Sequence, residues 1–566
     1  MSQFDFTEKM SGRDGGGRPQ SYYYLWHLVA LGVIDAEFGP PSDPEDELSA
    51  SAAPTITGTV WDEIGAAFPQ AFEPAVVALI DVGVSRLHPN LRTRIDDRSI
   101  DLASHRYGAA TQPADPANPH EREQEAPFFA GLDISGLGAI DLGAGDAAFL
   151  SALVGELAAS KGVVRQLADG DETFGSHGTA AAGLVVGEPA ASVASEDGSG
   201  PAAIEPASLA TADGETLGIN PNQGILPYFG VDPFSRLLSI RTSFDTDAEQ
   251  FIAAFLYAWH CGVDVILLPR GLPDPVRSRV APKPELAQDG DLRANRERAG
   301  LFARLADANG EEIDPYATAP ASDREWTILE KLIVAISRKI PVICAAGNDG
   351  ESQIIYPAKL AAPDNGVVAV GAVTPRGLRS GFSNYGEGLT LVAPTDDSEV
   401  FNRHQLRRDT THPAASTDYF DAGRGRIVPY SPLALVTTDL PGIYGYEAGS
   451  PPRSARVPPF ADPGTGGGYY TTFGGTSGAS ALVAGVAALA ARANRARHGP
   501  GASLPGVAAK DLLVKSSRLA TAVRPGTAQL APDPMNADDE PSKGLPYYFG
   551  AGLLDARRVV AEVITS

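Results

Sequence analysis

A continuous apolar run at residues 76–80, VVALI, ends directly in Asp81. An unbroken run of this kind is typical of a parallel strand that is buried on both faces. Open α/β sheets build their sites at the carboxyl ends of such strands. The pattern therefore predicts a carboxylate at the functional edge of a parallel sheet, with a simple turn-forming role for Asp81 as the alternative.

The stretch GGTSGASALVAGVAALAA at residues 474–491 has a different pattern. Its glycines and threonine predict a tight loop, and the small apolar residues that follow predict a buried helix. Ser477 would then lie at the helix N-terminus, where unpaired N–H groups and partial positive charge favour an anion. A nucleophilic serine would gain from both, whereas the alternative is a serine that only caps the helix.

His177 lies in GSHGT, before the helix-like run AAAGLVVG. A serine hydroxyl is a poor nucleophile until a histidine accepts its proton, and the histidine needs a carboxylate to fix its tautomer. Asp81, His177 and Ser477 supply these three groups. For His177 alone, a helix cap or a buried imidazole is the alternative.

Ordered blocks of the chain resemble the subtilisin-like serine proteases, the subtilase family. ALIDVGVSRLHPNL resembles the aspartate block, GSHGTAAAGLVVG the histidine block and FGGTSGASALVAGVAAL the serine block. IPVICAAGNDG resembles the block with the oxyanion asparagine, here Asn348, and YFGAGLLDARRVV resembles the closing segment. The order Asp, His, Ser is the subtilisin order, and the resemblance extends from about residue 76 to about residue 560.

The resemblance implies an α/β fold with a mostly parallel central sheet, helices on both faces and several long surface insertions. It implies a serine endopeptidase in which Ser477 attacks, His177 transfers the proton and Asp81 orients the imidazole. Asn348 and the Ser477 backbone N–H would bind the oxyanion. An alternative from another class is a catalytically quiet domain that binds peptides or a partner protein. The chemistry requires no cofactor, and no calcium site is identifiable from the sequence.

The resemblance also implies two segments that clamp the substrate as an added β-strand. One contains Leu268, Pro269, Arg270 and Gly271, and the other contains Ala345, Ala346 and Gly347, followed by Asp349 after Asn348. Proline stands at position 269 where the family usually has serine, and proline has no backbone N–H. A carboxylate at Asp349 would favour lysine or arginine before the cleaved bond, unless Arg270 pairs with it.

The pattern divides the chain into an N-terminal extension, residues 1–50, and a catalytic domain, residues 51–566. The apolar run at 22–34 is too short to span a membrane and predicts a short accessory helix. It is also a poor signal peptide, which favours a cytoplasmic location without a membrane partner.

Four insertions, at about 99–172, 188–217, 272–324 and 396–431, interrupt the family pattern. We expect a helix at 146–167, a flexible stretch at 188–217 and a surface helix at 288–309. Loops of this length more often have a role in recognition or gating than no function at all, which suggests a regulatory protein partner.

The charge balance excludes one class of partner. The 566 residues include 45 Lys and Arg against 70 Asp and Glu, a formal net charge of −25. Such a surface repels nucleic acid and anionic membranes, and simple solubility is its plainest explanation. A protein or peptide substrate is expected, and no nucleic acid.

Overall fold

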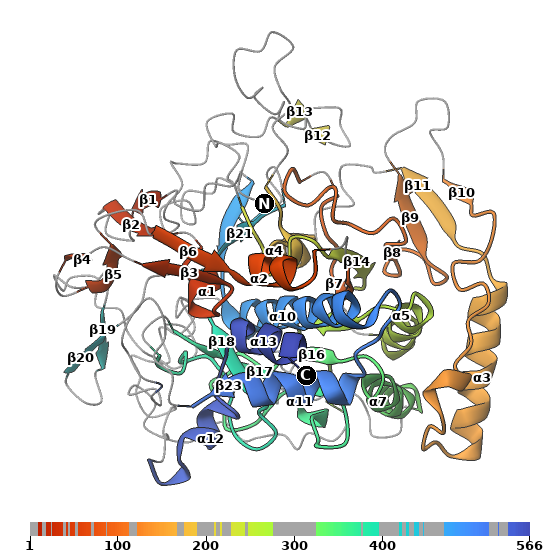
Figure 1. Ribbon diagram of the computed structural model, residues 1–566. Coiled ribbons are helices and arrows are strands. Elements are labelled where there is room, and N and C mark those ends of the chain that lie inside the picture. Colours follow the sequence, from red (N-terminus) through yellow and green to blue (C-terminus); the bar gives the residue numbers. More distant parts are fainter. Residues whose placement is uncertain are drawn as a thin grey trace, which may run out of the picture.

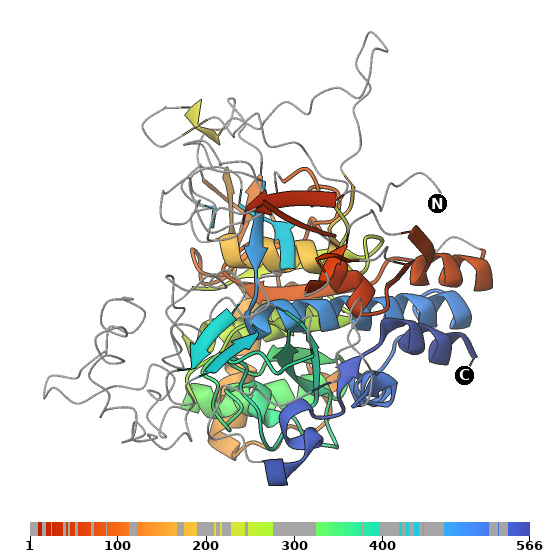
Figure 2. The same cartoon turned by 90° about the vertical axis from the view of Figure 1, so that its left-hand side faces the viewer.

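The computed structural model (Figures 1 and 2) describes much of the chain. The described residues are 9–13, 19–23, 25–37, 41–43, 46–50, 55–69, 73–86, 88–112, 121–166, 175–189, 209–210, 216–217, 228–243, 247–274, 324–374, 377–395, 418–421, 426–429, 435–440, 445–446, 469–519, 530 and 541–565.

A large, mostly parallel sheet forms the centre of the described chain, as predicted (Figure 1). Runs such as VICA and VVAVGAV are buried at every position of their strands, so both faces of the sheet are covered. The strands lie in the order β10 (Arg122–Glu123), β11 (Val163–Gln166), β9 (Ala109–Gln112), β8 (Ile100–Asp101), β14 (Arg236–Arg241), β7 (Val76–Asp81), β15 (Val265–Leu268), β16 (Val342–Ala345), β17 (Val367–Val373), β18 (Leu391–Pro394), β24 (Leu553–Leu554) and β23 (Ser517–Arg518). The pairs β10–β11, β8–β9 and β23–β24 are antiparallel, and the α/β prediction is confirmed.

Smaller two-stranded pairs and helices surround this sheet. The pairs are β1 (Lys9–Arg13) with β2 (Pro19–Tyr23), β3 (Ile34–Glu37) with β6 (Thr55–Thr59), β4 (Pro41–Asp43) with β5 (Asp46–Ala50), β12 (Leu209–Ala210) with β13 (Thr216–Leu217), β19 (Asp418–Asp421) with β20 (Arg426–Pro429), and β21 (Leu435–Thr438) with β22 (Tyr470–Phe473). The helices are α1 (Trp26–Ala30), α2 (Val60–Ala67), α3 (Ala144–Ala159), α4 (Ser176–Val186), α5 (Ala248–His260), α7 (Arg324–Ser337), α10 (Gly475–His498), α11 (Gly506–Ser516), α12 (Leu545–Phe549) and α13 (Ala556–Thr565), with short 3-10 turns η1 (Ser135–Leu137), η3 (Ala358–Leu360) and η4 (Pro541–Lys543).

Helix α10 is the central helix of the fold. It packs against β7, β15, β16, β17 and β18 and against α4, and α11 and α13 run beside it (Figure 1). Small residues allow this close packing: a Cβ added at Gly485 would lie 2.5 Å from the Val231 Cβ. By length and composition α10 could cross a membrane, but the apolar part of the helix is 100% buried inside the protein.

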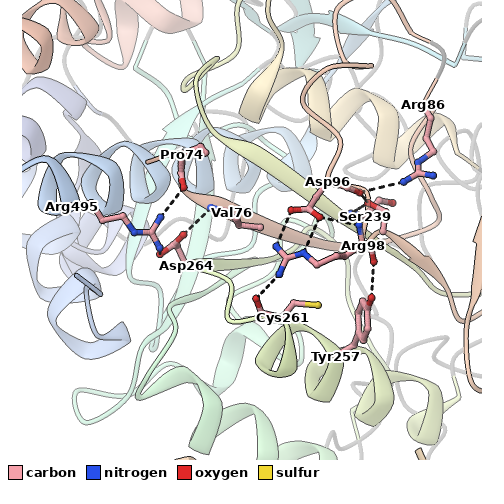
Figure 3. Close-up of polar contacts among 11 residues, drawn as sticks. Pro74, Val76, Arg86, Asp96, Arg98, Ser239, Tyr257, Cys261, Asp264 and Arg495 are labelled. Carbon is pink, nitrogen blue, oxygen red and sulfur yellow. Dashed lines mark hydrogen bonds and ion pairs between the residues drawn. The ribbon is translucent and has the colours of Figure 1, made fainter. Parts of the chain in front are cut away.

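Ion pairs at the amino end of the sheet fix α10 in place (Figure 3). Arg495 donates to the Pro74 carbonyl at 2.8 Å and to Asp264 at 2.6 Å. Asp264 in turn accepts the Val76 N–H at 2.8 Å. These bonds tie the C-terminal part of α10, the helix that begins near Ser477, to the start of β7.

The N-terminal extension packs against the C-terminal helix (Figure 2). The predicted helix at 22–34 is shorter than expected, because α1 spans Trp26–Ala30. The Leu31 carbonyl accepts the Ala556 N–H at 2.8 Å, and Arg557 forms ion pairs with Asp35 and Glu63. Strand β3 precedes residue 50 and β6 follows it, and the two strands pair. The structural unit at the N-terminal end therefore extends past the expected boundary at residue 50.

The first insertion differs from the predicted helix at 146–167. Helix α3 ends at Ala159, and residues 163–166 form β11, which pairs with β9. Consecutive β-branched valines at 163 and 164 favour a strand, and the extended conformation of Ser160 ends the helix. Apart from residues 188–189 and the pair β12–β13, the stretch at 188–217 lies outside the described residues, as does the predicted helix at 288–309.

Candidate active site

Asp81 ends β7, and its side chain is only 2% exposed. One carboxylate oxygen, Oδ1, accepts the Val82 N–H at 2.8 Å. The other, Oδ2, lies 2.6 Å from His177 Nδ1. A buried carboxylate bonded in this way holds an imidazole in one orientation.

His177 lies in the first turn of α4, and a glycine brings this turn close to Asp81. A Cβ added at Gly178 would lie 2.1 Å from the Gly83 carbonyl oxygen, so only glycine permits the approach. Because Nδ1 faces the carboxylate, the neutral ring keeps Nε2 as its proton acceptor. The ring packs edge to face on Phe473, 5.2 Å between centroids, on the segment that leads to Ser477.

Ser477 lies in the first turn of α10 and is 7% exposed. Gly475, at φ +71, makes the turn into the helix. The Ser477 hydroxyl donates to the Pro269 carbonyl oxygen at 2.7 Å. The serine is thus held by the segment that the sequence predicts to bind substrate, and its hydroxyl donates to that segment rather than to His177.

Asn348 follows β16 and has its amide oriented by Thr476. Its Oδ1 accepts the Thr476 N–H and the Thr476 hydroxyl, both at 2.8 Å. The amide NH₂ group therefore lies toward the start of α10, where a Cβ added at Gly475 would be 3.0 Å from Nδ2. Gly475 is two residues before Ser477, so the amide nitrogen lies close to the turn that precedes the candidate nucleophile. Nothing in the pattern of the sequence assigns a role to Thr476, although it directly precedes the candidate nucleophile.

The two predicted substrate segments leave the carboxyl ends of neighbouring strands. Leu268 and Ala345 are the buried last residues of β15 and β16, and Ala346 is also buried. Beyond the strand ends, a third segment is bonded to both. The Leu272 N–H donates to the Tyr356 carbonyl at 2.8 Å, and the Ile355 N–H donates to the Ala346 carbonyl at 3.0 Å.

Ile355 therefore lies between the two segments. A Cβ added at Gly347, which has φ +114, would be 2.7 Å from the Ile355 Cγ2. Gly271 lies between Arg270 and the bonded Leu272. Sequence reasoning missed Ile355, because nothing in its local pattern indicates that it contacts the segment after β16.

The two charged residues of these segments have separate surroundings. Arg270 Nη1 donates to the Ser243 carbonyl at 3.0 Å, and the guanidinium lies 5.7 Å from the Phe251 ring centroid. Burial lowers the pKa of Arg270, and the negative charge of Asp81 opposes this effect. The Asp349 N–H donates to Asn384 Oδ1 at 2.8 Å, and Asp349 is half-buried.

Within the part of the chain that the structure describes, no group of three or more His, Cys, Asp or Glu side chains is arranged to bind a metal ion. The site therefore consists of a buried carboxylate, an imidazole, a serine at a helix N-terminus and an oriented amide. This set can transfer a proton, attack a carbonyl and donate to an oxyanion.

The chain belongs to the subtilase family of serine proteases. The family model matches residues 73–426 and 444–552, which include Asp81, His177, Asn348 and Ser477.

Individual relatives match over shorter stretches. The chain is 43% identical to subtilisin BL and 41% identical to subtilisin Savinase, both from Lederbergia lenta, over 68 residues. These residues are 12% of this chain and 24% of either relative, so the match spans about a quarter of the curated relatives.

Solved structures match over more of the chain at lower identity. An epidermin leader peptide processing serine protease from Staphylococcus aureus matches at 16% identity and a TM-score of 0.40, covering 86% of this chain and 75% of its own. The prenylagaramide maturation protease PagA matches at 16% identity and a TM-score of 0.38, covering 89% and 98%.

Proposed function

We propose that this protein is a serine endopeptidase that hydrolyses peptide bonds through Asp81, His177 and Ser477, with Asn348 as an oxyanion donor. The observation that carries the proposal is the 2.6 Å contact between His177 Nδ1 and the buried Asp81 carboxylate. A carboxylate in this position stabilises the imidazolium that forms when the histidine accepts a proton. Family membership supports the same chemistry.

The reaction begins when the Ser477 hydroxyl leaves the Pro269 carbonyl and turns to His177 Nε2. The oxygen attacks the substrate carbonyl carbon as its proton moves to Nε2, giving a tetrahedral intermediate. The Asn348 NH₂ group and the Ser477 backbone N–H donate to the oxyanion. The imidazolium then protonates the leaving amine, and a water molecule releases the acyl group by the same steps in reverse.

The extra bond of Ser477 in the free protein is compatible with this mechanism. Hydrogen bonds between catalytic groups are often long or poorly aligned without substrate and tighten in the complex. Pro269 has no N–H, but its carbonyl is an acceptor for a substrate backbone N–H. A substrate strand that bonds to this carbonyl would displace the Ser477 hydroxyl and free it to turn to His177.

A fluorophosphonate probe tests the proposal, since it reacts only with an activated serine. We expect the probe to label Ser477, which mass spectrometry of the modified peptide would locate. We also expect the protein to cleave a mixture of denatured substrate proteins. The Ser477→Ala variant should show neither, while its circular dichroism and melting temperature stay close to those of the unmutated protein.

The alternative function is a catalytically quiet domain that binds peptides. Binding of peptides without probe labelling or cleavage would support that alternative and contradict the proposed hydrolysis. Cytoplasmic location and a regulatory protein partner stay predictions from the sequence, and calcium stays possible, with no site identified for it. Cell fractionation, co-purification with the Ser477→Ala variant and melting with added calcium or chelator would test them in turn.

A further inference from the structure

The hairpin of β21 and β22 connects the helix that carries His177 to the helix that carries Ser477. Its two strands are antiparallel, with Leu435 opposite Phe473. Strand β21 lies beside α4 (Figure 1), and β22 runs into the turn that opens α10. The hairpin therefore contacts the helix of the base through one strand and is continuous with the helix of the nucleophile through the other.

Two threonine hydroxyls of β21 bond to the first turns of α4. Thr438 Oγ1 donates to the Thr179 carbonyl oxygen at 2.7 Å. Thr437 Oγ1 donates to the Ala180 carbonyl oxygen, also at 2.7 Å. Both threonine side chains are fully buried, where a hydroxyl that lost its partner would be costly. Because Thr179 and Ala180 follow His177 by two and three residues, these bonds hold the turn that carries the imidazole.

Gly183 of α4 permits this close approach of the strand. A Cβ added at Gly183 would lie 2.2 Å from Thr438 Oγ1 and 2.5 Å from Thr437 Oγ1. In a close-packed interior neither distance can be accommodated, so a side chain at this position would push β21 away from the helix. The glycine and the two hydrogen bonds together set the spacing between α4 and β21.

Side chains of the hairpin also contact both candidate catalytic turns. The Phe473 ring packs edge to face on the His177 ring, 5.2 Å between centroids. Its partner across the hairpin, Leu435, reaches the start of α10, because a Cβ added at Gly478 would lie 2.7 Å from the Leu435 Cδ1. Gly478 directly follows Ser477. One cross-strand pair therefore contacts the base and the first turn of the nucleophile's helix.

A buried histidine bonds the start of β22 to a third segment. His88 Nδ1 accepts the Asn90 N–H at 3.1 Å, so the neutral ring carries its proton on Nε2 and donates it to the Tyr469 carbonyl at 2.7 Å. The Tyr470 hydroxyl donates to Asn90 Oδ1 at 2.5 Å. His88 and Asn90 follow β7, the strand that ends in Asp81. The hairpin is thus bonded to the segments of all three candidate catalytic residues.

We propose that Thr438 is a positioning residue that holds the His177 imidazole at the place where Ser477 can use it. Its hydroxyl fixes the first turns of α4 relative to the strand that leads to the nucleophile. The residue acts through α4 and does not touch the reacting atoms. This inference rests on the proposed function. Since a misplacement of about 1 Å can cost on the order of 10²-fold in rate, loss of the bond should slow the chemical step without weakening substrate binding.

Two substitutions in the full chain separate the hydroxyl from the shape of the side chain. Thr438→Val keeps the branched shape and removes the donor, whereas Thr438→Ser keeps the donor and removes the methyl group. For Thr438→Val we expect kcat on a peptide and the rate constant of fluorophosphonate labelling each to fall about tenfold, with KM unchanged. Thr438→Ser should restore most of the lost rate.

Thr390→Val is the matched control, because Thr390 is also a buried threonine, and its hydroxyl accepts the Ala369 N–H of β17 at 3.0 Å. This variant should have a lower melting temperature but unchanged kcat and labelling rate. Rates in Thr438→Val equal to those of the unmutated protein would overturn the inference. So would an equal loss in Thr438→Ser or in Thr390→Val, since the α4 bond would then not be the cause. If Thr438→Val does not fold, Thr437→Val takes its place, and unchanged rates there would overturn the inference.

Probe labelling of the unmutated protein separates this inference from the proposed function. If Ser477 is labelled at the same rate in the unmutated protein and in Thr438→Val, only the inference about Thr438 fails. If the unmutated protein is not labelled, the proposed hydrolysis fails and the inference falls with it.

Discussion

The Asp81–His177 pair and Ser477 differ in how close their contacts are to those that the proposed reaction needs. On one side, Asp81 and His177 are already in contact at 2.6 Å, and the carboxylate is buried. On the other side, the Ser477 hydroxyl is bonded to the Pro269 carbonyl, which a substrate strand would occupy. In the proposed mechanism the base is therefore already assembled in the free protein, whereas the nucleophile has a partner that must be exchanged.

This difference separates two contributions to catalysis, one to the chemical step and one to substrate binding. A preassembled hydrogen bond between carboxylate and imidazole requires no reorganisation when the reaction starts, so it acts on the chemical step. A serine that must leave one acceptor for another couples its activation to substrate binding. We therefore expect changes in the Asp81 half to affect kcat most, and changes around Ser477 and Asn348 to depend on the substrate.

After the complete loss expected for Ser477→Ala, the largest effect should come from Asp81→Asn. The amide cannot stabilise the imidazolium and favours the wrong tautomer, so kcat should fall about 10⁴-fold, as in other serine proteases. Steady-state hydrolysis of a peptide measures it, and the exposed Asp133→Asn is the matched control, with no expected change. A loss of less than tenfold would mean that the Asp81–His177 pair is not the working base.

The next largest effect should come from Asn348→Ala, because one of the two oxyanion donors is lost. Turnover should fall about 10²–10³-fold, the magnitude established for the oxyanion asparagine of subtilisin, while probe labelling stays measurable. An unchanged turnover would show that another group holds the oxyanion.

Thr476→Val sharpens this prediction. It removes the hydroxyl that donates to Asn348 Oδ1 and leaves the Thr476 N–H in place. We expect roughly a tenfold loss of kcat, and little further loss when the change is made in the Asn348→Ala background, since the two residues act as a unit. Fully additive losses in this double-mutant cycle would show that Thr476 acts independently of the amide.

Changes in the substrate-binding segments should alter specificity rather than turnover. Because the Ile355 side chain lies close to Gly347, Ile355→Gly should raise the rate of cleavage after large residues relative to alanine by about tenfold. Asp349 predicts a modest preference for lysine and arginine instead, which Asp349→Ala should remove. A peptide library profiled with both variants distinguishes volume from charge at this position, and identical profiles would contradict both expectations.

The smallest expected effect on turnover is that of His27, which should change stability in acid and leave kcat at neutral pH unaltered. His27 of α1 is fully buried, and among the described residues neither ring nitrogen has a hydrogen-bond partner. Burial lowers the pKa of His27 from 6.5 to about 3. Because the folded protein favours the neutral ring, this residue destabilises the fold progressively as the pH falls from 6.5 toward 3.

His27→Leu should therefore reduce the fall in melting temperature on acidification without altering kcat at neutral pH. Thermal melts over the acidic range measure it, with exposed His498→Leu as the control. If the melting temperatures of the variant and the unmutated protein fall in parallel, His27 is not an acid-sensitive group. The melts also separate unfolding from lost chemistry when activity declines in acid.

Sequence patterns could predict the elements that carry the site. An unbroken apolar run ending in Asp81 and a small-residue helix after Ser477 leave few alternatives, because burial dictates both patterns. They could not predict that the Ser477 hydroxyl bonds to Pro269, since this contact joins residues 208 positions apart. Ile355 and β11 were missed for the same reason: their partners, Ala346 and β9, are set by tertiary packing.

The bond between Leu31 and Ala556 has a consequence for the lifetime of the protein. It joins the first helical unit to α13, and α13 packs on α10, the helix that presents Ser477. A cut that released residues 25–37 would uncover apolar side chains of α1 and remove the partner of Arg557 at Asp35. If the proposed peptidase cut its own chain at this end, the packing behind the helix of Ser477 would be weakened, and the strength of this contact would then limit the loss of activity.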